Sequence, residues 1–332
     1  MKKSRRYLCF FLLFASSAWL LSCGRPARYE DRIKVAAVFP GSRDSLPAAV
    51  IHRALDRAAQ EMLIVYEVSD HVPPGEMEKV LRDYVGKGYE LIFGDDRGAE
   101  AVVRRFARDH PETAFCFNSR LGSVDPNFSV FSFWLHEPAY LCGMIAGRLT
   151  AFGRIGVVAE APHPALNAAL NAFRDGVLDV NPDALVEIIL TGTGEGSEGV
   201  GAAAVRLIES GADYLFAASP EAIAVCREKR VPAFGFLRNW YSAAPDTMVT
   251  GAVWDAGPLV EIAVEDVKND SWRARDLREW SMMAKGGAYL APYHSFEARI
   301  PYQVREEIDE IRRSILSGLY RVPADETNPA AD

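Results

Sequence analysis

Short apolar runs alternate with amphipathic segments along most of the chain, and this alternation limits the possible folds more than any other feature. The first run, residues 33–39 (IKVAAVF), is closed by Pro40 and Gly41, and residues 46–62 then place apolar side chains at helical spacing. An uninterrupted apolar run followed by a helix is typical of a parallel strand buried on both faces. The order recurs as far as residue 133, which predicts a doubly wound α/β sheet. We expect strands at 33–39, 63–68, 90–94, 113–117 and 128–133, and helices at 46–62, 74–85 and 98–109.

The pattern then starts again, so the 332 residues are expected to form two α/β lobes of similar size. Open parallel sheets bind ligands beyond the carboxyl ends of their strands. Two such sheets facing each other would enclose a cleft that closes around a solute by a hinge movement. Further helices are expected at 137–151, 165–179, 200–210, 220–230, 257–267 and 302–317, and further strands at 154–159, 186–190, 214–217, 233–236 and 248–253.

The N-terminal segment has the features of an export signal with a lipid attachment site. A basic stretch at residues 2–6 precedes an apolar run at 7–21 that is short for a membrane-spanning helix. The run ends in Leu-Leu-Ser-Cys, which resembles a bacterial lipobox, whose cysteine receives a diacylglycerol before cleavage. We therefore expect a signal peptide at 1–22, lipidation of Cys23 and a polar tether at 23–31. The alternative is a plain signal peptide or anchor in which Cys23 is incidental.

Charge and cysteine content exclude several classes of protein. The formal net charge is −8, so the chain lacks the basic footprint that nucleic-acid binding requires, and no nucleic-acid partner is expected. Cys116, Cys142 and Cys226 are widely spaced and odd in number, which implies no disulfide framework. Each lies in an apolar context and is expected to be a small buried residue.

The motifs do not indicate a catalytic or metal site. Residues 194–199 (GEGSEG) satisfy the G-x-G-x-x-G dinucleotide pattern, but no acid follows at a suitable distance. The two glutamates within the segment would also repel a pyrophosphate, so a flexible loop explains it better. The six histidines show neither H-E-x-x-H nor Cys-pair spacing, which leaves a zinc site without support. We therefore predict no catalytic residue, no metal and no cofactor.

Segments spread over nearly the whole mature chain carry a resemblance to a known family. They are VAAVFPGS at 35–42, GYELIFG at 88–94, FWLHEPAYLCGMIA at 133–146, NAFRDGVLDVNP at 171–182 and GADYLF at 211–216. In this order they resemble the basic membrane protein family of bacterial solute-binding lipoproteins, which includes purine nucleoside receptors.

The resemblance implies the type I periplasmic-binding-protein fold, in which two doubly wound lobes are joined by a hinge of three crossovers. Mapped onto this chain, it assigns residues 32–135 and 252–324 to lobe one, 136–251 to lobe two and 325–332 to a frayed tail. The three crossovers would lie near Trp134, Trp240 and Trp254.

The segments that would contact a ligand depart from the family pattern. The family loop after the first strand carries an Asp, an aromatic residue and an Asn, whereas residues 41–48 (GSRDSLPA) keep only Asp44 as a candidate for the acid. Leu237 stands where the family has a carboxylate suited to a ribose diol, and Trp254 and Asp255 replace a Lys and an Asn. A site built on paired polar groups loses affinity when those partners are missing, so nucleoside specificity does not follow from the resemblance.

Three tryptophans would suit a flat or apolar ligand such as a nucleobase. Stacking on an aromatic ring contributes roughly 1–3 kcal/mol per base, and Trp134, Trp240 and Trp254 are expected near the cleft. Packing of the hinge or of the lobe interface is an equally good explanation for them. The remaining predicted ligand-binding residues are polar, and they are Ser42, Asp44, Asp95, Glu137, His163, Ser219, Arg238, Asn239 and Asp255.

Structural explanations compete for several of these polar residues. Asp95 would also fit a charged turn that caps the next helix. Glu137 would complement a helix dipole, and His163 would fit a surface loop between two prolines.

The resemblance implies a membrane-tethered, extracytoplasmic lipoprotein that binds a small nucleoside-like or nucleobase-like solute. Its partners would be the permease subunits of an ABC importer and, through the lipid, the membrane. The two lobes would close around the solute without chemistry. One alternative is a non-transport lipoprotein of the same fold that acts as a sensor or in surface interactions. Another is a cleft enzyme such as a nucleoside hydrolase.

Overall fold

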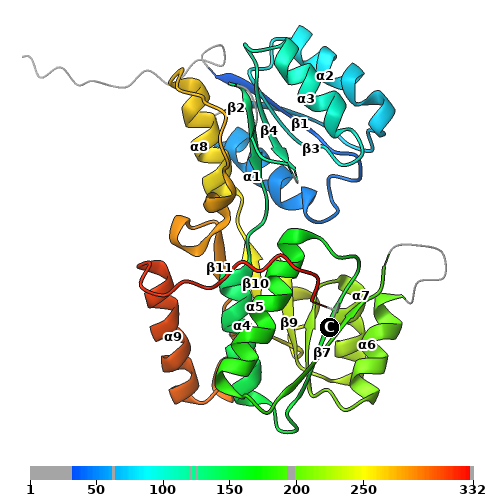
Figure 1. The fold of residues 1–332 in the computed structure, drawn as a ribbon, viewed down its shortest axis with the longest axis vertical. Coiled ribbons are helices and arrows are strands. Elements are labelled where there is room, and N and C mark those ends of the chain that lie inside the picture. The colour runs from blue at the N-terminus through cyan, green and yellow to red at the C-terminus, as the bar shows by residue number, and fades with distance from the viewer. Residues whose placement is uncertain (1–31, 62–63, 120, 124–125, 193–198, 330–332) are drawn as a thin grey trace, which may run out of the picture.

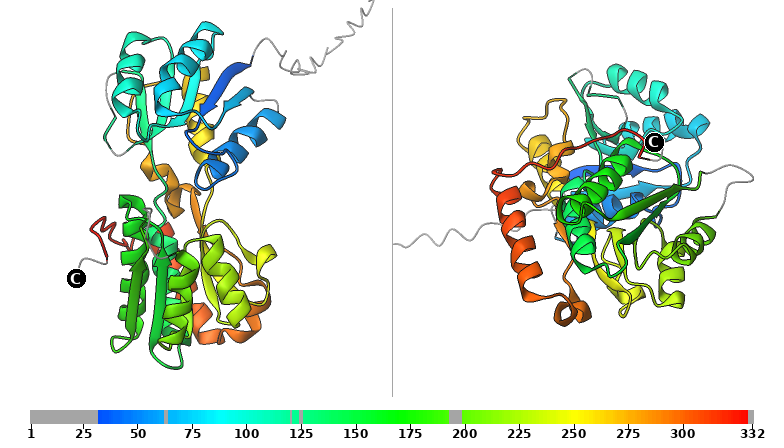
Figure 2. Two further views of the ribbon diagram at one scale, coloured as in Figure 1. Left: turned by 90° about the vertical axis from the view of Figure 1, so that its right-hand side faces the viewer. Right: turned by 60° about the horizontal axis from the view of Figure 1, so that its bottom comes forward.

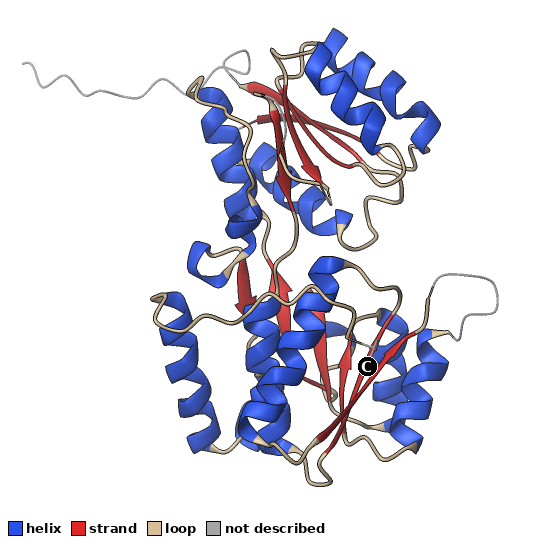
Figure 3. Ribbon diagram, viewed as in Figure 1, coloured by secondary structure: helices blue, strands red, loops and turns tan. Residues whose placement is uncertain are grey.

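The chain folds into two α/β lobes, one above the other in Figure 1. The computed structural model describes residues 32–61, 64–119, 121–123, 126–192 and 199–329. The expected signal peptide, Cys23 and the tether lie outside the described residues, as does most of the glycine-rich segment at 194–199. Figure 3 shows helices on both faces of the strands in each lobe, which confirms the doubly wound arrangement.

Lobe one is built on a parallel sheet with the strand order β2-β1-β3-β4-β5. Alternate residues of β1 face opposite sides of this sheet. Val35 and Ala37 pack with α1 (Ala48–Gln60) and α8 (Gly257–Lys268), whereas Ala36 and Val38 pack with α2 (Met77–Gly86) and α3 (Glu100–Asp109). Burial on both faces explains why the strand is apolar throughout. The strands are β1 (Ile33–Val38), β2 (Ile64–Ser69), β3 (Leu91–Asp95), β4 (Ala114–Asn118) and β5 (Phe128–Phe131).

Lobe two contains a second sheet with the order β11-β10-β9-β8-β6-β7, parallel except for β11. Helices α4 (His136–Leu149) and α5 (Pro164–Val180) cover one face, with α9 (Tyr302–Leu316) beside α4. Helices α6 (Val200–Glu209) and α7 (Pro220–Lys229) cover the other. The strands are β6 (Arg154–Ala159), β7 (Leu185–Leu190), β8 (Tyr214–Ala217), β9 (Ala233–Leu237), β10 (Met248–Trp254) and β11 (Ala288–Leu290).

Residues 252–324 are divided between the lobes differently from our expectation. We assigned residues 252–324 to lobe one, but within that range it is α8 that contacts α1 and β1. Strand β11 pairs with β10, and α9 packs against α4, so both belong to lobe two. Because β9 and β10 are adjacent parallel strands of one sheet, the chain stays in lobe two until β10 ends at Trp254.

The chain therefore crosses between the lobes at residues 132–135, 254–257 and 277–287. Trp134 and Trp254 lie at the first two crossings, as the resemblance implied. Trp240 does not lie at a crossing, because it belongs to the turn that joins β9 to β10 within one sheet.

A short chain of buried hydrogen bonds joins all three crossings. The indole Nε1 of Trp254 donates to the Oγ of Ser281 at 3.0 Å, and that hydroxyl donates to the main-chain oxygen of Ser132 at 2.6 Å. All three residues are buried. Ser281 thus ties the third crossing to the other two. Figure 2 shows the narrow waist at which the chain passes between the lobes.

Helices α4 and α5 touch backbone to backbone at two glycines. A Cβ on Gly143 of α4 would overlap the carbonyl oxygen of Phe173, and a Cβ on Gly176 of α5 would overlap that of Tyr140. The absence of a side chain at both points lets the helices approach this closely. Helix α4 directly follows the first crossing, so this close contact with α5 fixes the position of the rest of lobe two relative to the hinge.

The described end of the chain lies on α5 and does not fray. The side-chain amide of Asn171 donates to the carbonyl oxygens of Asp325 and Thr327 at 2.9 and 3.0 Å. Asn167 donates to the carbonyl oxygen of Glu326 at 3.1 Å. Both asparagines are buried. The tail is therefore bound to lobe two at residues 325–327, where we expected a loose end.

We predict that Gly143→Ala and Gly176→Ala each lower the free energy of unfolding by about 1–3 kcal/mol or more, because the added methyl group meets a main-chain oxygen that cannot move aside. Urea unfolding measures the effect. Gly201→Ala in α6 is the matched control, since its Cβ would meet only Val225 Cγ2 at 3.7 Å. A Gly→Ala change within a helix that meets no close contact raises the free energy of unfolding by about 0.5–1 kcal/mol. Equal stability of all three variants would refute the close contact.

Candidate functional site

A cavity of about 680 Å³ lies between the two lobes. Lobe one contributes the loop after β1, at residues 44–47, together with Arg97 and Asn118 after β3 and at the end of β4. Lobe two contributes the loops that follow β6, β8 and β9. All these segments lie at the carboxyl ends of parallel strands, where this class of fold binds its ligands. The volume is within the range of pockets for small organic molecules.

Aromatic rings form one wall of this cavity, and Phe133 of the first crossing is at their centre. The rings of Phe133 and His163 are stacked, with 5.7 Å between centroids and 20° between planes. Phe236 meets Phe133 edge to face at 6.0 Å. All three residues line the cavity. The wall therefore presents flat, apolar surface from the hinge and from lobe two.

The three tryptophans have different places. Trp240 lines the cavity, but its ring also packs beneath Gly235, and its Nε1 donates to the carbonyl oxygen of Phe236 at 2.9 Å. Trp134 packs in the hinge, where the guanidinium of Arg278 lies over its ring at 4.9 Å. It does not line any of the cavities described for residues 32–329.

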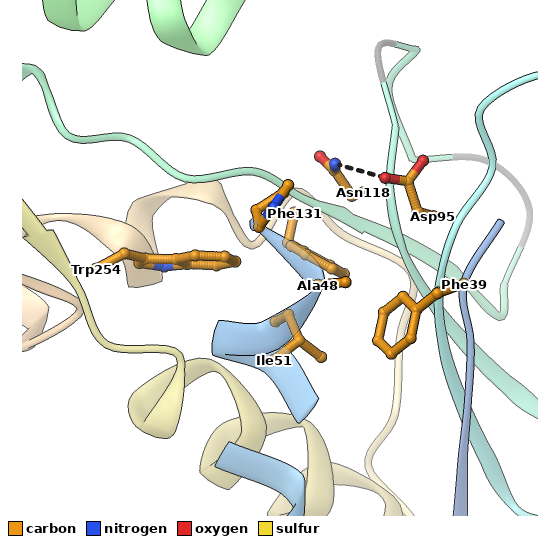
Figure 4. Close-up of a pocket in the computed structure, with 9 residues that line it drawn as sticks. Phe39, Ala48, Ile51, Asp95, Asn118, Phe131 and Trp254 are labelled. Atoms are coloured by element: carbon orange, nitrogen blue, oxygen red, sulfur yellow. Dashed lines mark hydrogen bonds between the residues drawn. The ribbon is translucent and has the colours of Figure 1, made fainter. Parts of the chain in front are cut away.

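Trp254 fills the space between the hinge and lobe one. Its side chain is 3% exposed and stacks on Phe131 with 6.4 Å between centroids. Figure 4 shows it facing a small space of about 10 Å³ that Phe39 and Ile51 also line. So small a space holds no more than one water molecule. Trp254 thus packs the hinge while one edge of it reaches the cleft.

Two adjacent acids follow β3 and differ in environment. Asp95 pairs with Arg97 at 2.8 Å and accepts a hydrogen bond from Asn118 at 3.4 Å. Asp96 is 4% exposed, and its Oδ2 has no hydrogen-bond partner among the described residues. Burial raises the pKa of Asp96 to about 6. Asp96 also lines a cavity of about 350 Å³ that Arg97 and His163 share with it.

Two predicted serines mainly shape the backbone around the site. The Oγ of Ser42 accepts from the amide of Asp44 at 3.2 Å, and Asp44 lines the cavity. Ser219 also lines the cavity, and its Oγ accepts from the amide of Ala222 at 3.2 Å, so it caps α7.

Glu137 is a hinge residue and lies outside the linings of these cavities. Its Oε2 accepts from the amide of Met283 at 2.7 Å, which joins the start of α4 to the third crossing. Burial raises the pKa of this carboxyl, and the bond to Met283 opposes that rise.

The remaining predicted residues meet at a second chamber of about 340 Å³. Arg238, Asn239 and Asp255 line it together with Trp254 and Tyr289. Asp255 pairs with Arg57 of α1 at 3.2 Å and accepts from the amide of Gly257 at 2.8 Å. Asn239 Nδ2 lies 3.0 Å from Nε2 of His294. Arg238 lines both chambers, so it lies at the boundary between them.

Leu237 separates the two chambers in an unusual backbone conformation. Its φ is +65°, in the left-handed region that residues other than glycine rarely adopt. Such residues cluster at ligand and active sites. Leu237 lines both chambers. The position to which the resemblance assigned an acid thus lines both chambers, and an apolar side chain stands there.

The sequence predicts a strand end beside the cleft at residues 95–98, from which only Asp95 was selected, and it did not indicate Phe133, Phe236 or Asn118 as cleft residues. Asn118 and Phe236 end or nearly end strands, so the strand-end rule alone could have indicated them. Phe133 carries no such signal, because its role depends on where the first crossing passes.

Three further findings concern metals, thiols and membranes. Within the described ranges there is no group of three or more His, Cys, Asp or Glu side chains that could hold a metal ion. Cys116, Cys142 and Cys226 are free and buried, and burial raises the pKa of each thiol. Among the same residues, none of the helices is both long and apolar enough to cross a bilayer.

Comparison with known proteins gives a consistent result. Residues 33–279 match a family described as ABC transporter substrate-binding protein, PnrA-like. A purine-binding protein of Brucella abortus is 25% identical over 304 residues, which cover 89% of this chain and 84% of that protein. A proposed ABC transporter glucose-binding protein of Haloferax volcanii is 24% identical over 253 residues, covering 76% and 63%.

The fold is also that of solved solute-binding proteins. The structure of an ABC transporter solute-binding protein from Conexibacter woesei matches with a TM-score of 0.69 at 22% identity, over 88% of this chain and 99% of that one. The type I periplasmic-binding fold that the resemblance implied is thereby confirmed.

We predict that Asp96→Asn raises the free energy of unfolding at pH 8 by about 3 kcal/mol, because a pKa raised from 3.8 to about 6 makes the buried charge unfavourable. The folded state binds the Asp96 proton more tightly than the unfolded state does. The penalty therefore grows from about pH 4 to pH 6, and the gain of the variant should vanish below pH 4.

Urea unfolding of wild type and variant at pH 4 and pH 8 measures this difference. Asp246→Asn changes an exposed carboxylate and should show no comparable gain. The burial argument would be wrong if Asp96→Asn raised the free energy of unfolding equally at both pH values.

Proposed function

The chain belongs to the family of PnrA-like substrate-binding proteins of ABC transporters, and we propose that it holds one small solute between its lobes for delivery to a permease. The observation that carries the proposal is the cavity of about 680 Å³, because strand-end segments of both lobes line it. Closure about the three crossings would bring these segments together on the solute. Substrate-binding proteins of ABC transporters work outside the cytoplasm.

We further propose a nucleobase or nucleoside as the class of solute. Phe133, Phe236 and His163 offer flat rings on which a base can stack. Base stacking is worth about 1–3 kcal/mol per ring in proteins that bind single strands. The relative from Brucella abortus named as purine-binding supports the same class. Asp44, Asp96 and Ser219 would supply hydrogen bonds to the edge of the base or to a sugar.

The proposed mechanism involves binding and release without bond chemistry. Several polar groups at the cavity shape loops or form ion pairs, as the Ser219 cap of α7 and the pair of Asp95 with Arg97 illustrate. The matched family is one of substrate-binding proteins, and this supports binding over catalysis. A nucleoside hydrolase is therefore the weaker proposal.

A non-transport role is the second candidate, and Leu237 is the observation that favours it. An apolar side chain faces the cleft where the family has a ribose-binding acid, so the cleft could have lost its original ligand. A sensor or surface-interaction lipoprotein would then use the same hinge. A solute that stabilises the protein separates the two candidates.

We also propose that Cys23 carries a lipid that holds the protein on the outer side of a membrane. The support is the basic stretch, apolar run and lipobox-like Leu-Leu-Ser-Cys of the first 23 residues. Several acyl chains on one cysteine make such an anchor stable.

We predict that the protein starting at Gly24 is stabilised in a thermal-unfolding screen of purine and pyrimidine nucleosides, free bases and unrelated metabolites. A solute at one hundred times its Kd adds about 2.7 kcal/mol, a shift of about 5 °C for a chain of this size. A shift with a base or nucleoside supports the proposed class, and a shift with another metabolite replaces it. If none of the compounds stabilises the ligand-free protein, the result favours the non-transport candidate.

A pair of histidine variants then locates the binding. His163→Ala removes a ring stacked on Phe133 at the cavity and should weaken binding of the stabilising compound about tenfold, which is the value of one such ring. His110→Ala removes a ring that lies 4.3 Å from Phe106, on the α3 side of lobe one, and should leave the Kd unchanged. Equal effects of the two changes would place the solute elsewhere.

For the anchor, we predict that Cys23→Ala abolishes palmitate labelling in bacterial cells and releases the protein from the membrane fraction, because the acyl acceptor is gone. Cys9→Ala, within the expected signal peptide, should keep both properties. A Cys23→Ala protein that still incorporates palmitate would contradict the assignment.

A further inference from the structure

The second chamber is strongly basic in an otherwise acidic protein. Its cavity of about 340 Å³ is bounded by α1 of lobe one and by the ends of β9 and β10 in lobe two. Arg53, Arg57 and Arg238 face it, against the single carboxylate of Asp255. The other lining residues are uncharged, whereas the whole chain carries a net charge of −8. The excess positive charge at this point therefore requires an explanation.

Only part of this positive charge is neutralised. Arg57 pairs with Asp255 at 3.2 Å. Within the described parts of the chain, Arg53 and Arg238 have no ion-pair partner. Burial and the positive charge of Arg53 both lower the pKa of Arg238, so the two guanidiniums repel each other across the space between the lobes. Hinge closure would bring them closer and increase that repulsion unless an anion lay between them.

The two arginines come from different lobes and differ in their surroundings, which suits an anion clamp. Arg238 is held in place because its guanidinium stacks on the ring of Trp240 at 4.3 Å. Arg53 is an exposed side chain of α1. Guanidinium groups present paired N–H donors that match the two oxygens of a carboxylate or phosphate.

We propose that the second chamber binds the anionic oxygen group of the solute, a carboxylate or a phosphate, between Arg53 of lobe one and Arg238 of lobe two. This inference rests on the proposed solute-binding function. Arg238 also lines the larger cavity, so one molecule can place its flat part against Phe133 and its anionic group in the second chamber. The anion then removes the repulsion that opposes closure, and the solute itself completes the closed state.

The test uses inorganic phosphate and succinate as probes, so it does not depend on knowing the solute. Thermal unfolding of the protein starting at Gly24 is measured against either anion, with sodium chloride at equal ionic strength as the reference, because salt alone screens surface charges. We expect both or one of the anions to stabilise wild type. Arg53→Gln and Arg238→Gln should each weaken the binding of that anion at least about tenfold, as expected for the loss of a hydrogen-bonded charge.

Arg313→Gln is the matched control, since it removes the same charge from an exposed position on α9 and should leave anion binding unchanged. Urea unfolding of each variant verifies that it is folded. Two results would overturn the proposal: wild type that responds to neither anion beyond chloride, or Arg53→Gln and Arg238→Gln proteins that respond like wild type.

Matched neutral and phosphorylated compounds separate this proposal from the proposed function. Adenosine and adenosine monophosphate differ only in the phosphate. Tighter binding of the monophosphate, lost in Arg238→Gln, supports the anion clamp. Equal binding of both compounds in wild type and variant would leave solute binding intact while refuting the clamp.

Discussion

The buried hydroxyl of Ser281 links the three crossings that connect the two lobes. It accepts from Trp254 and donates to Ser132, so three chain segments far apart in sequence share one pivot. Phe133 is the residue after Ser132, and its ring is the centre of the cleft wall. Glu137 then ties the first helix of lobe two to Met283. The same few residues therefore set both the hinge and the position of the aromatic surface.

Much of the fold is readable from the sequence because burial on both faces of a parallel strand leaves a clear signal. The run at 33–39 and its successors predict strands that the structure contains within a few residues. The allocation of strands to lobes carries no such signal. β10 and β11 are apolar like their neighbours, and only the hydrogen-bonding register shows that both belong to lobe two. Our expected division therefore missed the return crossing at residues 277–287 and placed β11 and α9 in lobe one.

The site was harder to read, because a cleft depends on where side chains from separate segments meet. The rule that ligands bind at strand ends suggests Asp95 and Arg238. It does not distinguish Asp95, which pairs with Arg97, from Asp96, whose pKa is raised by burial. Trp254 illustrates the opposite difficulty. Its residue type suits ligand stacking, yet its ring is enclosed by the hinge. Residue type therefore predicts what a side chain can do, and the packing around it decides whether it does so.

The direction of β1 has a mechanical consequence. Its carboxyl end leads into the loop that lines the cleft, so its first residue, Ile33, lies at the opposite edge of lobe one. Cys23 is ten residues earlier, and ten residues span at most about 35 Å. A lipid at Cys23 would therefore keep the edge of lobe one opposite the cleft within about 35 Å of the membrane surface.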